Sequence, residues 1–283
     1  TTDSKYVVVT KGTFPAASLR TLDSTGNESA PFRVYIKPDV PPSHQARLQL
    51  TFSDGSFTDV QTITVLVNPT YATQSVNGVH LTLTNNGRLG FFDFPDNHQG
   101  IGFVFNGINH LFEGGLMIGT SPAQVVNVIR NVTSGQDEDL TSRDFFTLKT
   151  PGNISDQDGF TAFGDSTAPL ANKIGLRIKM HSYAYSDPVD SRYIILQYEI
   201  TNASTSATIS NLYAGIFLDW DIGNTNDEIG QNYSRYDATR SLGYAFSGLS
   251  QGRREYLGIR ALDSAASFRS LINNGSIDLS RTP

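Results

Sequence analysis

Alternation of apolar and polar residues is the feature of this sequence that most limits its possible folds. In the stretch 32–37, Phe32, Val34 and Ile36 are separated by more polar residues. Because successive side chains of a β-strand point to opposite faces of a sheet, a period of two predicts a half-buried strand. Similar segments, separated by Gly, Asn, Asp and Pro, predict strands along the whole chain. The predicted strands are 6–10, 32–37, 46–52, 59–67, 78–84, 88–94, 101–105, 111–118, 124–131, 144–150, 173–185, 192–201, 212–222, 242–246 and 256–262.

Helical periodicity is confined to one segment near the end of the sequence. Residues 264–272 are predicted to form a helix with Asp263 as its N-terminal cap. The remaining pattern of short strands and frequent turns is typical of antiparallel sandwiches and barrels. We therefore expect an all-β chain built from antiparallel β-sandwich domains.

One domain boundary is visible in the sequence. The strong strand pattern that ends at Val67 is followed by Asn68 and Pro69, and a proline cannot continue a strand ladder. The segment before it holds about four strands, fewer than the roughly seven of a complete sandwich. Residues 1–68 are interpreted as the end of a domain, or as a small domain. Residues 72–283 are expected to form a larger β-sandwich domain.

Charge and composition exclude several classes of partner and chemistry. The net charge of the 283-residue chain is -6, and Lys and Arg form no basic run, so a nucleic-acid partner is not expected. No apolar stretch approaches the length of a membrane span, so no membrane insertion is expected either. The sequence contains no Cys, which excludes disulfides, thiolate metal sites and a Cys nucleophile.

Two groups of motifs resemble parts of a known protein family. Residues 48–55 (LQLTFSDG) and 59–71 (DVQTITVLVNPTY) resemble the closing hairpin of the fibronectin-like domain that follows the catalytic domain in large bacterial subtilisin-like (S8) peptidases. A second group of motifs is similar to a β-rich region further downstream in exported S8 peptidases. These motifs are 87–91 (GRLGF), 99–103 (QGIGF), 111–119 (LFEGGLMIG) and 213–222 (YAGIFLDWDI).

The resemblance implies a location, partners and a function. It implies a fibronectin-like, partial domain over residues 1–68 and an accessory domain over 72–283. The function would be that of a non-catalytic module of a secreted or cell-surface serine endopeptidase. The module would brace or space the catalytic domain, or help to position substrate, and its partners would be neighbouring domains of the same polypeptide.

The sequence itself does not contain the catalytic motifs of that family. Residues 119–123 (GTSPA) imitate the motif around the nucleophilic Ser, but the motifs that carry the Asp and the His are missing. In the family the nucleophile opens a long helix, whereas residues 124–131 are predicted to form a strand. Residues 119–123 are therefore interpreted as a turn after a buried strand, and this segment is not expected to be an enzyme.

Carboxylates leave a hydrolase open as a further alternative. Candidates for a catalytic pair are Glu113, Glu199, Asp219 and Asp221, but the sequence does not give the separation that would decide it. Glu113 lies in an apolar strand pattern and is interpreted as a structural carboxylate bonded to backbone N–H groups or to an arginine such as Arg88. The acidic stretches 137–139 and 156–159 are predicted to be exposed turns.

The strand 212–222 carries the one predicted metal site. Ile216, Leu218 and Trp220 share one face, whereas Asp219 and Asp221 share the other. Neighbouring carboxylates repel each other unless they are neutralised, and an oxygen-rich loop follows at 223–228. Ca²⁺ takes six to eight oxygen ligands. The predicted calcium ligands are Asp219, Asp221, Asn224, Asn226 and Asp227, and the alternative is an acidic turn whose carboxylates pair with Arg235 or Arg240.

Binding of carbohydrate is the main alternative to an accessory role. A saccharide-binding module would expose aromatic side chains on one sheet next to polar groups. The candidate aromatic residues are Tyr183, Tyr185, Tyr193, Tyr233 and Tyr236. The only tryptophan, Trp220, is expected on a buried face, which disfavours it as a sugar-binding side chain. The partner would then be an extracellular glycan or protein.

Overall fold

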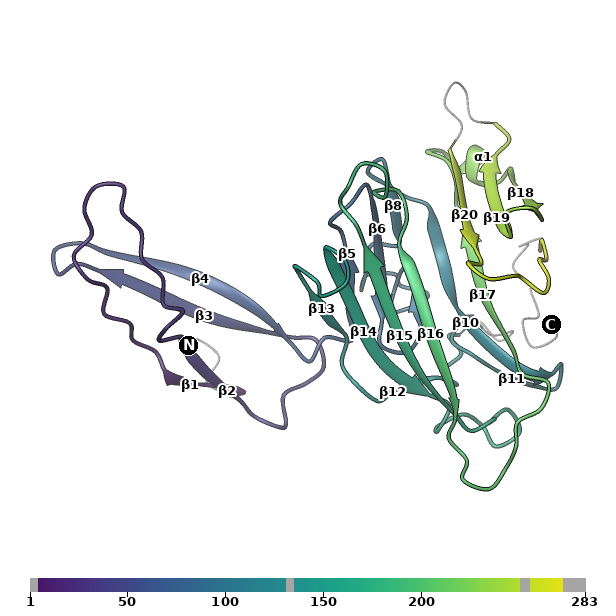
Figure 1. Ribbon diagram of the computed structural model, residues 1–283, viewed down its shortest axis with the longest axis horizontal. Helices are drawn as coiled ribbons and strands as arrows, with labels where there is room; N and C mark the ends of the chain where they lie inside the picture. The colour runs from purple at the N-terminus through teal and green to yellow at the C-terminus, as the bar shows by residue number, and fades with distance from the viewer. Residues whose placement is uncertain (1–4, 131–134, 250–254, 272–283) are drawn as a thin grey trace. The chain divides into compact units, whose positions relative to one another are not determined.

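The computed structural model describes residues 5–130, 135–249 and 255–271 (Figure 1). The described chain is mostly β-strand, arranged in several antiparallel sheets that do not close into a barrel. None of its described helices is both long enough and apolar enough to cross a membrane. The chain divides at Pro69 into two compact units, Thr1–Pro69 and Thr70–Pro283, which are described separately.

The first unit consists of two antiparallel strand pairs. Strand β1 (Val7–Lys11) pairs with β2 (Arg33–Ile36), and β3 (His44–Ser53) pairs with β4 (Thr58–Val67). The β3–β4 turn has Gly55 at a φ of 93°, and the Asp54 carboxylate accepts the N–H groups of Ser56 and Phe57 at 2.9 and 2.8 Å. These are the turn residues that a hairpin requires.

The core of the first unit is small. Its buried hydrophobic residues are Val7, Val40, Ala46 and Val67. Further along the apolar face of the hairpin, Ile63 and Phe52 are 46% and 47% exposed. This apolar face is therefore only half covered. A two-stranded sheet alone buries too little apolar surface for independent stability.

The second unit contains an eight-stranded sheet in the order β11-β10-β7-β6-β8-β9, in which β17 also pairs with β10 and β5 with β6. Its strands are β5 (Tyr71–Gln74), β6 (Val79–Thr84), β7 (Arg88–Leu89), β8 (Phe103–Phe105), β9 (Ile108–Asn109), β10 (Leu111–Ser121), β11 (Gln124–Asn127) and β17 (Tyr213–Trp220). Of residues 119–123, interpreted from the sequence as a turn, only Pro122 and Ala123 form the turn between β10 and β11, whereas 119–121 are the end of β10.

A five-stranded sheet in the order β12-β14-β15-β16, with β13 also paired to β14, forms a second layer. Its strands are β12 (Thr141–Ser142), β13 (Thr147–Lys149), β14 (Gln157–Gly164), β15 (Leu176–Ala184) and β16 (Ile195–Asn202). The prediction of an exposed turn at 156–159 is wrong from Gln157 onward, because β14 is an interior strand with Phe163 fully buried. Its Gly159 is a packing requirement, since an added Cβ would lie 2.3 Å from Ser182 Oγ.

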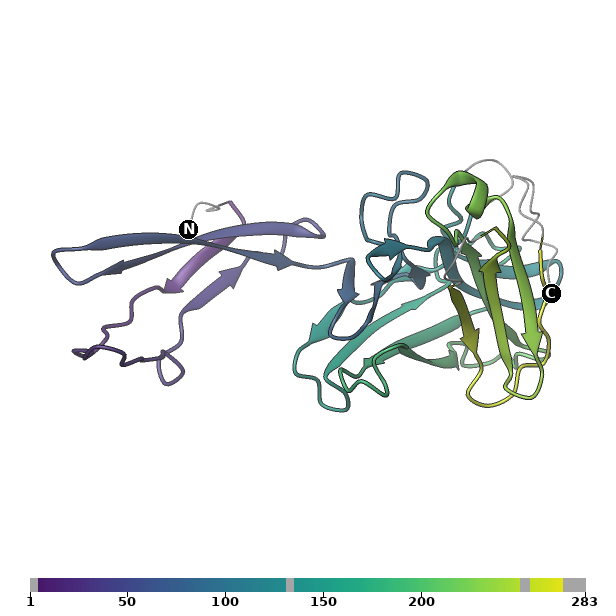
Figure 2. The same ribbon diagram turned by 90° about the horizontal axis from the view of Figure 1, so that it is seen from above.

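The main core lies between these two sheets, which Figures 1 and 2 show as separate layers. Leu83 and Leu116 reach it from the eight-stranded sheet, and Phe163 and Ile178 from the five-stranded sheet. On β17, the side chains of Ile216, Leu218 and Trp220 pack against this core, which confirms the face that the alternation predicted.

A three-stranded sheet completes the second unit. It consists of β18 (Asn232–Asp237), β19 (Leu242–Ser247) and β20 (Tyr256–Arg260), and it is preceded by the short helix α1 (Asn226–Ile229). Ala245 and Leu257 pack on Ile222 to form a small core against the rest of the unit.

The predicted helix over 264–272 is wrong for the described residues 264–271, which form no regular element, and Ile272 lies outside the described residues. Phe268 stacks on Tyr236, with ring centroids 5.3 Å apart. The same ring lies 2.4 Å from where a Cβ on Gly243 would be. Side-chain contacts with β18 and β19 therefore decide the path of this segment.

Candidate functional site

The outer surface of the three-stranded sheet follows from the alternation of side chains along β19. Gly243, Ala245 and Ser247 are buried, so the intervening Tyr244 and Phe246 point to the opposite, partly exposed face. Two large aromatic rings are thereby placed on one side of a strand that lies between two neighbours.

Strand register brings more aromatic rings to the same face. Phe246 lies opposite Tyr233 of β18 on one side and opposite Tyr256 of β20 on the other. The ring centroids are 6.0 Å apart for Tyr233 and Phe246 and 5.3 Å apart for Phe246 and Tyr256. Tyr244 adds a further ring, 6.2 Å from Tyr256. We call Tyr233, Tyr244, Phe246 and Tyr256 together the aromatic face.

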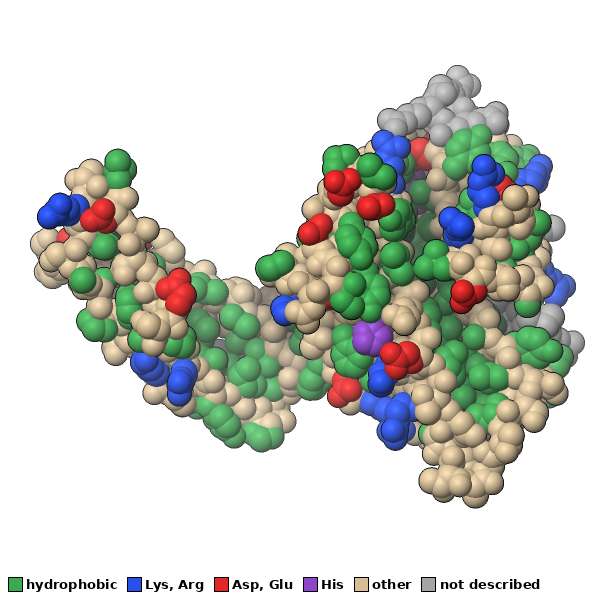
Figure 3. Space-filling model, in the orientation of Figure 1, with side chains coloured by type: hydrophobic (Ala, Val, Ile, Leu, Met, Phe, Trp, Pro, Cys, Tyr) green, Lys and Arg blue, Asp and Glu red, His purple; other side chains and the backbone are tan. Residues whose placement is uncertain are grey.

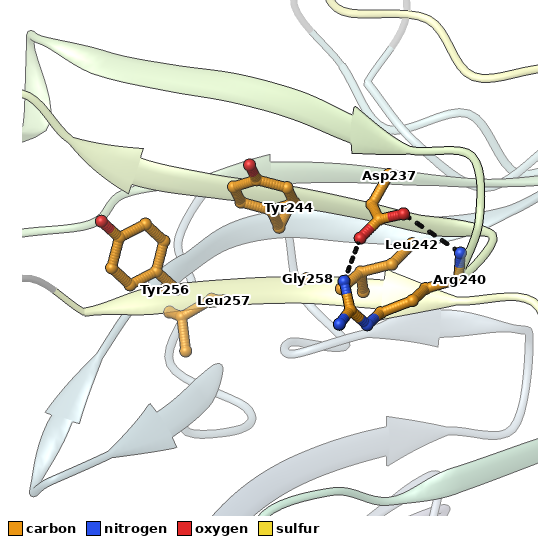
Figure 4. A pocket seen from close by; sticks show the side chains of 7 residues that line it. All are labelled: Asp237, Arg240, Leu242, Tyr244, Tyr256, Leu257 and Gly258. Carbon is orange, nitrogen blue, oxygen red and sulfur yellow. Dashed lines mark hydrogen bonds and ion pairs between the residues drawn. The ribbon is translucent and has the colours of Figure 1, made fainter.

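A hollow lies beside Tyr244 because its neighbour on β20 is Gly258. A Cβ on Gly258 would lie 2.3 Å from the Gly243 carbonyl oxygen, so this position requires glycine. The hollow has a volume of about 420 Å³, and Figure 4 shows it from close by. It is lined by Asp237, Arg240, Leu242, Tyr244, Tyr256, Leu257 and Gly258.

Charged groups stand on the rim of the hollow. Asp237 Oδ1 accepts a hydrogen bond from the Arg240 backbone N–H at 3.1 Å, and Oδ2 accepts one from Arg240 Nη1 at 2.5 Å (Figure 4). The hydrogen bond from the Arg240 side chain lowers the pKa of Asp237, so this carboxylate is ionised at neutral pH. Arg235 and Arg260 share the outer face, because they lie opposite Tyr244 and Leu242.

The local charge of this surface is opposite to that of the whole chain. The described residues of β18–β20 and the β18–β19 turn that reach this surface carry three positive charges, those of Arg235, Arg240 and Arg260, against the one negative charge of Asp237. The whole chain, in contrast, has a net charge of -6. Figure 3 shows blue Lys and Arg side chains over β18–β20. The surface combines flat apolar rings with an ionised carboxylate and guanidinium donors. Such an arrangement suits reversible binding of a ligand that is apolar on its faces and polar at its edges.

The aromatic residues predicted from the sequence are only partly brought together. Tyr183 lies on β15 of the five-stranded sheet, whereas Tyr185 and Tyr193 lie in the connection between β15 and β16. Tyr233 belongs to the aromatic face, but Tyr236 points to the other side of β18 and stacks on Phe268. The expectation that all of them share one sheet is therefore wrong, because they are divided between the five-stranded sheet, the three-stranded sheet and a connection.

Sequence reasoning missed Tyr244, Phe246 and Tyr256 as site residues. A signal for the first two was present, since Leu242, Tyr244 and Phe246 alternate with small residues. Their relation to Tyr256 depends on the pairing of β19 with β20, which the alternation does not specify.

The predicted acidic strand end is part of a buried ion-pair cluster. Asp219 lies opposite Glu113 on the neighbouring strand β10, and Arg130 pairs with both carboxylates. Its Nε donates to Glu113 Oε2 at 2.6 Å, and its backbone N–H donates to Oε1 at 2.5 Å. Arg88 Nη2 donates to the same Oε1 at 3.4 Å. The interpretation of Glu113 as a structural carboxylate bonded to backbone and to Arg88 is confirmed.

The cluster changes the expected partners of the acidic residues. The partner of Asp219 is Arg130, and Arg240 instead pairs with Asp237, so the sequence-based pairing of the acidic strand end with Arg240 is wrong. Burial lowers the pKa of Arg130, but the hydrogen bonds and charges of Glu113 and Asp219 outweigh this effect, so its pKa is raised. Of the candidate hydrolase carboxylates, Glu113 and Asp219 are brought together, whereas Glu199 lies on β16 and pairs with Lys179.

The predicted calcium ligands occupy several local environments. Burial and the neighbouring Asp219 raise the pKa of Asp221 to about 6. The backbone N–H of Asn224 donates to Glu228, and Asn226 and Asp227 lie in the first turn of α1. Within residues 5–130, 135–249 and 255–271, no group of three or more His, Asp or Glu side chains is arranged to hold a metal ion. Calcium binding by the mixed Asp and Asn set stays a prediction.

The acidic stretch 137–139 is not the exposed turn that the sequence predicted. Asp139 is only 2% exposed and accepts the backbone N–H of Asn127 at 3.3 Å. The Asn127 side chain donates to Asp137 at 3.1 Å. Burial and the charge of Asp137 raise the pKa of Asp139 to about 6. These contacts fasten the segment after β11, a role that the composition of the stretch does not reveal.

Comparisons of the chain with models of protein families, with curated proteins and with solved structures gave no match. The chemistry of the aromatic face must therefore be judged from its own side chains.

Proposed function

We propose that the chain is a non-catalytic binding module that holds a saccharide on the aromatic face. The observation that carries this proposal is the hollow between Tyr244 and Tyr256, which opens on a row of rings and has Asp237 and Arg240 on its rim. The saccharide-binding alternative from the sequence analysis is thereby preferred to the accessory role, although most of the residues proposed to bind differ from those that the sequence suggested.

A pyranose ring presents two kinds of surface. Its C–H groups form an apolar face that packs on an aromatic ring, and its hydroxyl groups lie around the edge. At the aromatic face, Tyr244 and Tyr256 offer the rings, and Asp237 and Arg240 offer hydrogen-bond acceptors and donors at the side. A few placed polar groups beside an apolar surface fix the orientation of a small ligand.

Titration calorimetry of the whole chain with a panel of oligosaccharides tests the proposal. We expect Tyr244→Ala and Tyr256→Ala to weaken binding at least about tenfold, since each removes a ring from the ligand surface. Tyr213→Ala is the matched control, because Tyr213 is 65% exposed on β17 and lies outside the aromatic face. Absence of saccharide binding, or equal binding by Tyr244→Ala, would overturn the proposal.

The proposal includes the finer architecture that the sequence predicts. The eight- and five-stranded sheets of the second unit would form a β-sandwich, which is supported by a core that draws Leu116 and Phe163 from the two layers. The first unit would be part of a fibronectin-like domain, which is supported by its half-covered apolar face.

A second candidate function comes from the resemblance to S8 peptidases. The chain would then be an accessory module of a secreted or cell-surface serine endopeptidase that braces a neighbouring domain of the same polypeptide. The supporting observation is the exposed apolar face of the β3–β4 hairpin with Phe52 and Ile63. Hydrogen exchange of β3 and β4 in this chain and in a longer polypeptide tests it: stronger protection in the longer polypeptide is expected, and equal protection rejects it.

A further inference from the structure

We infer that the saccharide bound at the aromatic face is anionic, carrying carboxylate or sulfate groups along its length. This inference rests on the proposed function, since it names the ligand class of the same site.

Three arginines lie around the rings of the aromatic face. Arg235 of β18 lies opposite Tyr244 of β19, and Arg260 of β20 lies opposite Leu242 of β19. The two arginines therefore flank β19 from either side. Arg240 stands at the rim of the hollow. A ligand that lies across the three strands therefore passes guanidinium groups on both sides of the rings.

Two of these guanidinium groups, those of Arg240 and Arg260, have hydrogen-bond donors available for a ligand. The Arg240 side chain is 70% exposed, and its Nη1 donates a hydrogen bond to Asp237. A guanidinium group has five N–H donors, so others remain available to a ligand. The Arg260 side chain makes no hydrogen bond or ion pair with any residue that the structure describes. Guanidinium groups recognise carboxylate and sulfate-like oxyanions through paired hydrogen bonds.

The basic character of this surface contrasts with the rest of the chain. The chain as a whole carries 21 Lys and Arg against 27 Asp and Glu. A basic surface on an acidic protein steers an anionic ligand to one place and repels it elsewhere.

The rings favour a saccharide over a single-stranded nucleic acid as the anionic ligand. Tyr233, Phe246 and Tyr256 lie side by side with centroids 6.0 and 5.3 Å apart and their planes tilted by 29° and 39°. Together they form an apolar surface that spans three neighbouring strands. Successive sugar units of an extended glycan can lie across such a surface, whereas a single-stranded nucleic acid is held by a positively charged groove that follows its backbone, and Lys and Arg form no basic run in this chain.

The experiment compares an acidic glycan with its uncharged form. We would measure binding of oligogalacturonate and of its methyl ester, at low and at raised salt, by titration calorimetry with the whole chain. We expect the acid to bind about tenfold more tightly than the ester at low salt, and the difference to shrink as salt rises. Arg260→Gln should weaken binding of the acid about threefold to tenfold and leave the ester unchanged.

Controls separate the charge inference from the proposed function. Arg177→Gln is the matched control, since Arg177 is an exposed arginine of β15 on the five-stranded sheet. Equal binding of acid and ester that is lost in Tyr244→Ala would overturn the charge inference and leave saccharide binding intact. No binding of either form, or of any uncharged oligosaccharide, would overturn both. Tighter, Tyr244-dependent binding of a single-stranded oligonucleotide would reject a saccharide as the ligand.

Discussion

Replacement of Glu113 by Gln tests whether the buried cluster stabilises the second unit through charge. The Glu113 side chain is 1% exposed and lies between Arg88 and Arg130, whose side chains are 2% and 16% exposed. Gln keeps the shape of the side chain but removes the negative charge. Arg130 retains Asp219 as a partner, whereas Arg88 loses its only ion pair among the described residues.

The expected loss is large because a buried guanidinium is left without a counter-charge. Burial already lowers the pKa of Arg88 to about 10, which reflects the cost of keeping it charged there. Removing one partner of a buried ion pair costs about 3–5 kcal/mol of unfolding free energy. For a unit of this size, that loss corresponds to a fall of roughly 10 °C in the unfolding midpoint.

The fluorescence of Trp220 gives a direct assay. Trp220 is the only tryptophan, and its ring lies 5.5 Å from that of Phe103 in the second unit, so its emission reports unfolding of that unit. Urea titrations of wild type and Glu113→Gln give the difference in unfolding free energy. Glu199→Gln is the control, because the Lys179–Glu199 pair is about half exposed and its loss should leave the midpoint nearly unchanged.

Two results would refute this reasoning. One is a loss in Glu113→Gln below about 1 kcal/mol, close to that of a surface ion pair. The other is the behaviour of the double variant Glu113→Gln plus Arg88→Met. If the uncompensated charge of Arg88 causes the loss, Met should recover part of the stability, and a further loss would show that packing dominates.

Three further changes test other parts of the second unit. Burial raises the pKa of Asp221 to about 6 from 3.8, so the folded state holds this proton more tightly than the unfolded state, and the stability of the fold falls as pH rises between those values. Asp221→Asn should therefore melt at a higher temperature than wild type at pH 7 and at the same temperature at pH 3. A difference in melting temperature that is constant across pH would contradict this. If calcium binds at the predicted site, millimolar Ca²⁺ should raise the unfolding midpoint of wild type relative to EDTA and leave the midpoint of the double variant Asp219→Asn plus Asp221→Asn unchanged. Equal wild-type midpoints in Ca²⁺ and in EDTA would reject the calcium prediction. Gly87→Ala should destabilise the fold by more than about 1 kcal/mol, because φ is 92° and the new Cβ would lie 2.9 Å from the Phe163 ring. Gly175→Ala is the control and should lose less unfolding free energy, since its φ is 93° but the space around it is open. Equal losses in the two variants would show that the Phe163 ring moves aside.

Local pattern determined much of the strand content. The alternation in 59–67 and 212–222 predicted β4 and β17, and it placed Ile216, Leu218 and Trp220 toward the core. An acidic residue in an apolar strand must have a partner, and this rule identified Arg88 as a partner of Glu113. Each of these inferences depends only on neighbours in the sequence and on the geometry of one strand.

Composition misled where packing overrides local preference. Gln157–Gly164 holds Asp and Gly residues that favour turns, yet it forms the interior strand β14, because Gly159 makes room for Ser182 and pairing with β13 and β15 satisfies its backbone. Asp139 reads as a surface residue but is buried, since Asn127 supplies its hydrogen bond.

The sequence by itself determined many of the strands and which of their faces are apolar, although not β14 or β18, because the two-residue period of a strand is written in neighbouring residues. Only the tertiary structure decided the candidate site. Tyr233 and Tyr256 meet on either side of Phe246 through the pairing of three strands, and Arg235 and Arg260 reach the same face by the same register. Register is a relation between distant segments, and a shift of one residue would send these side chains to the other face of the sheet.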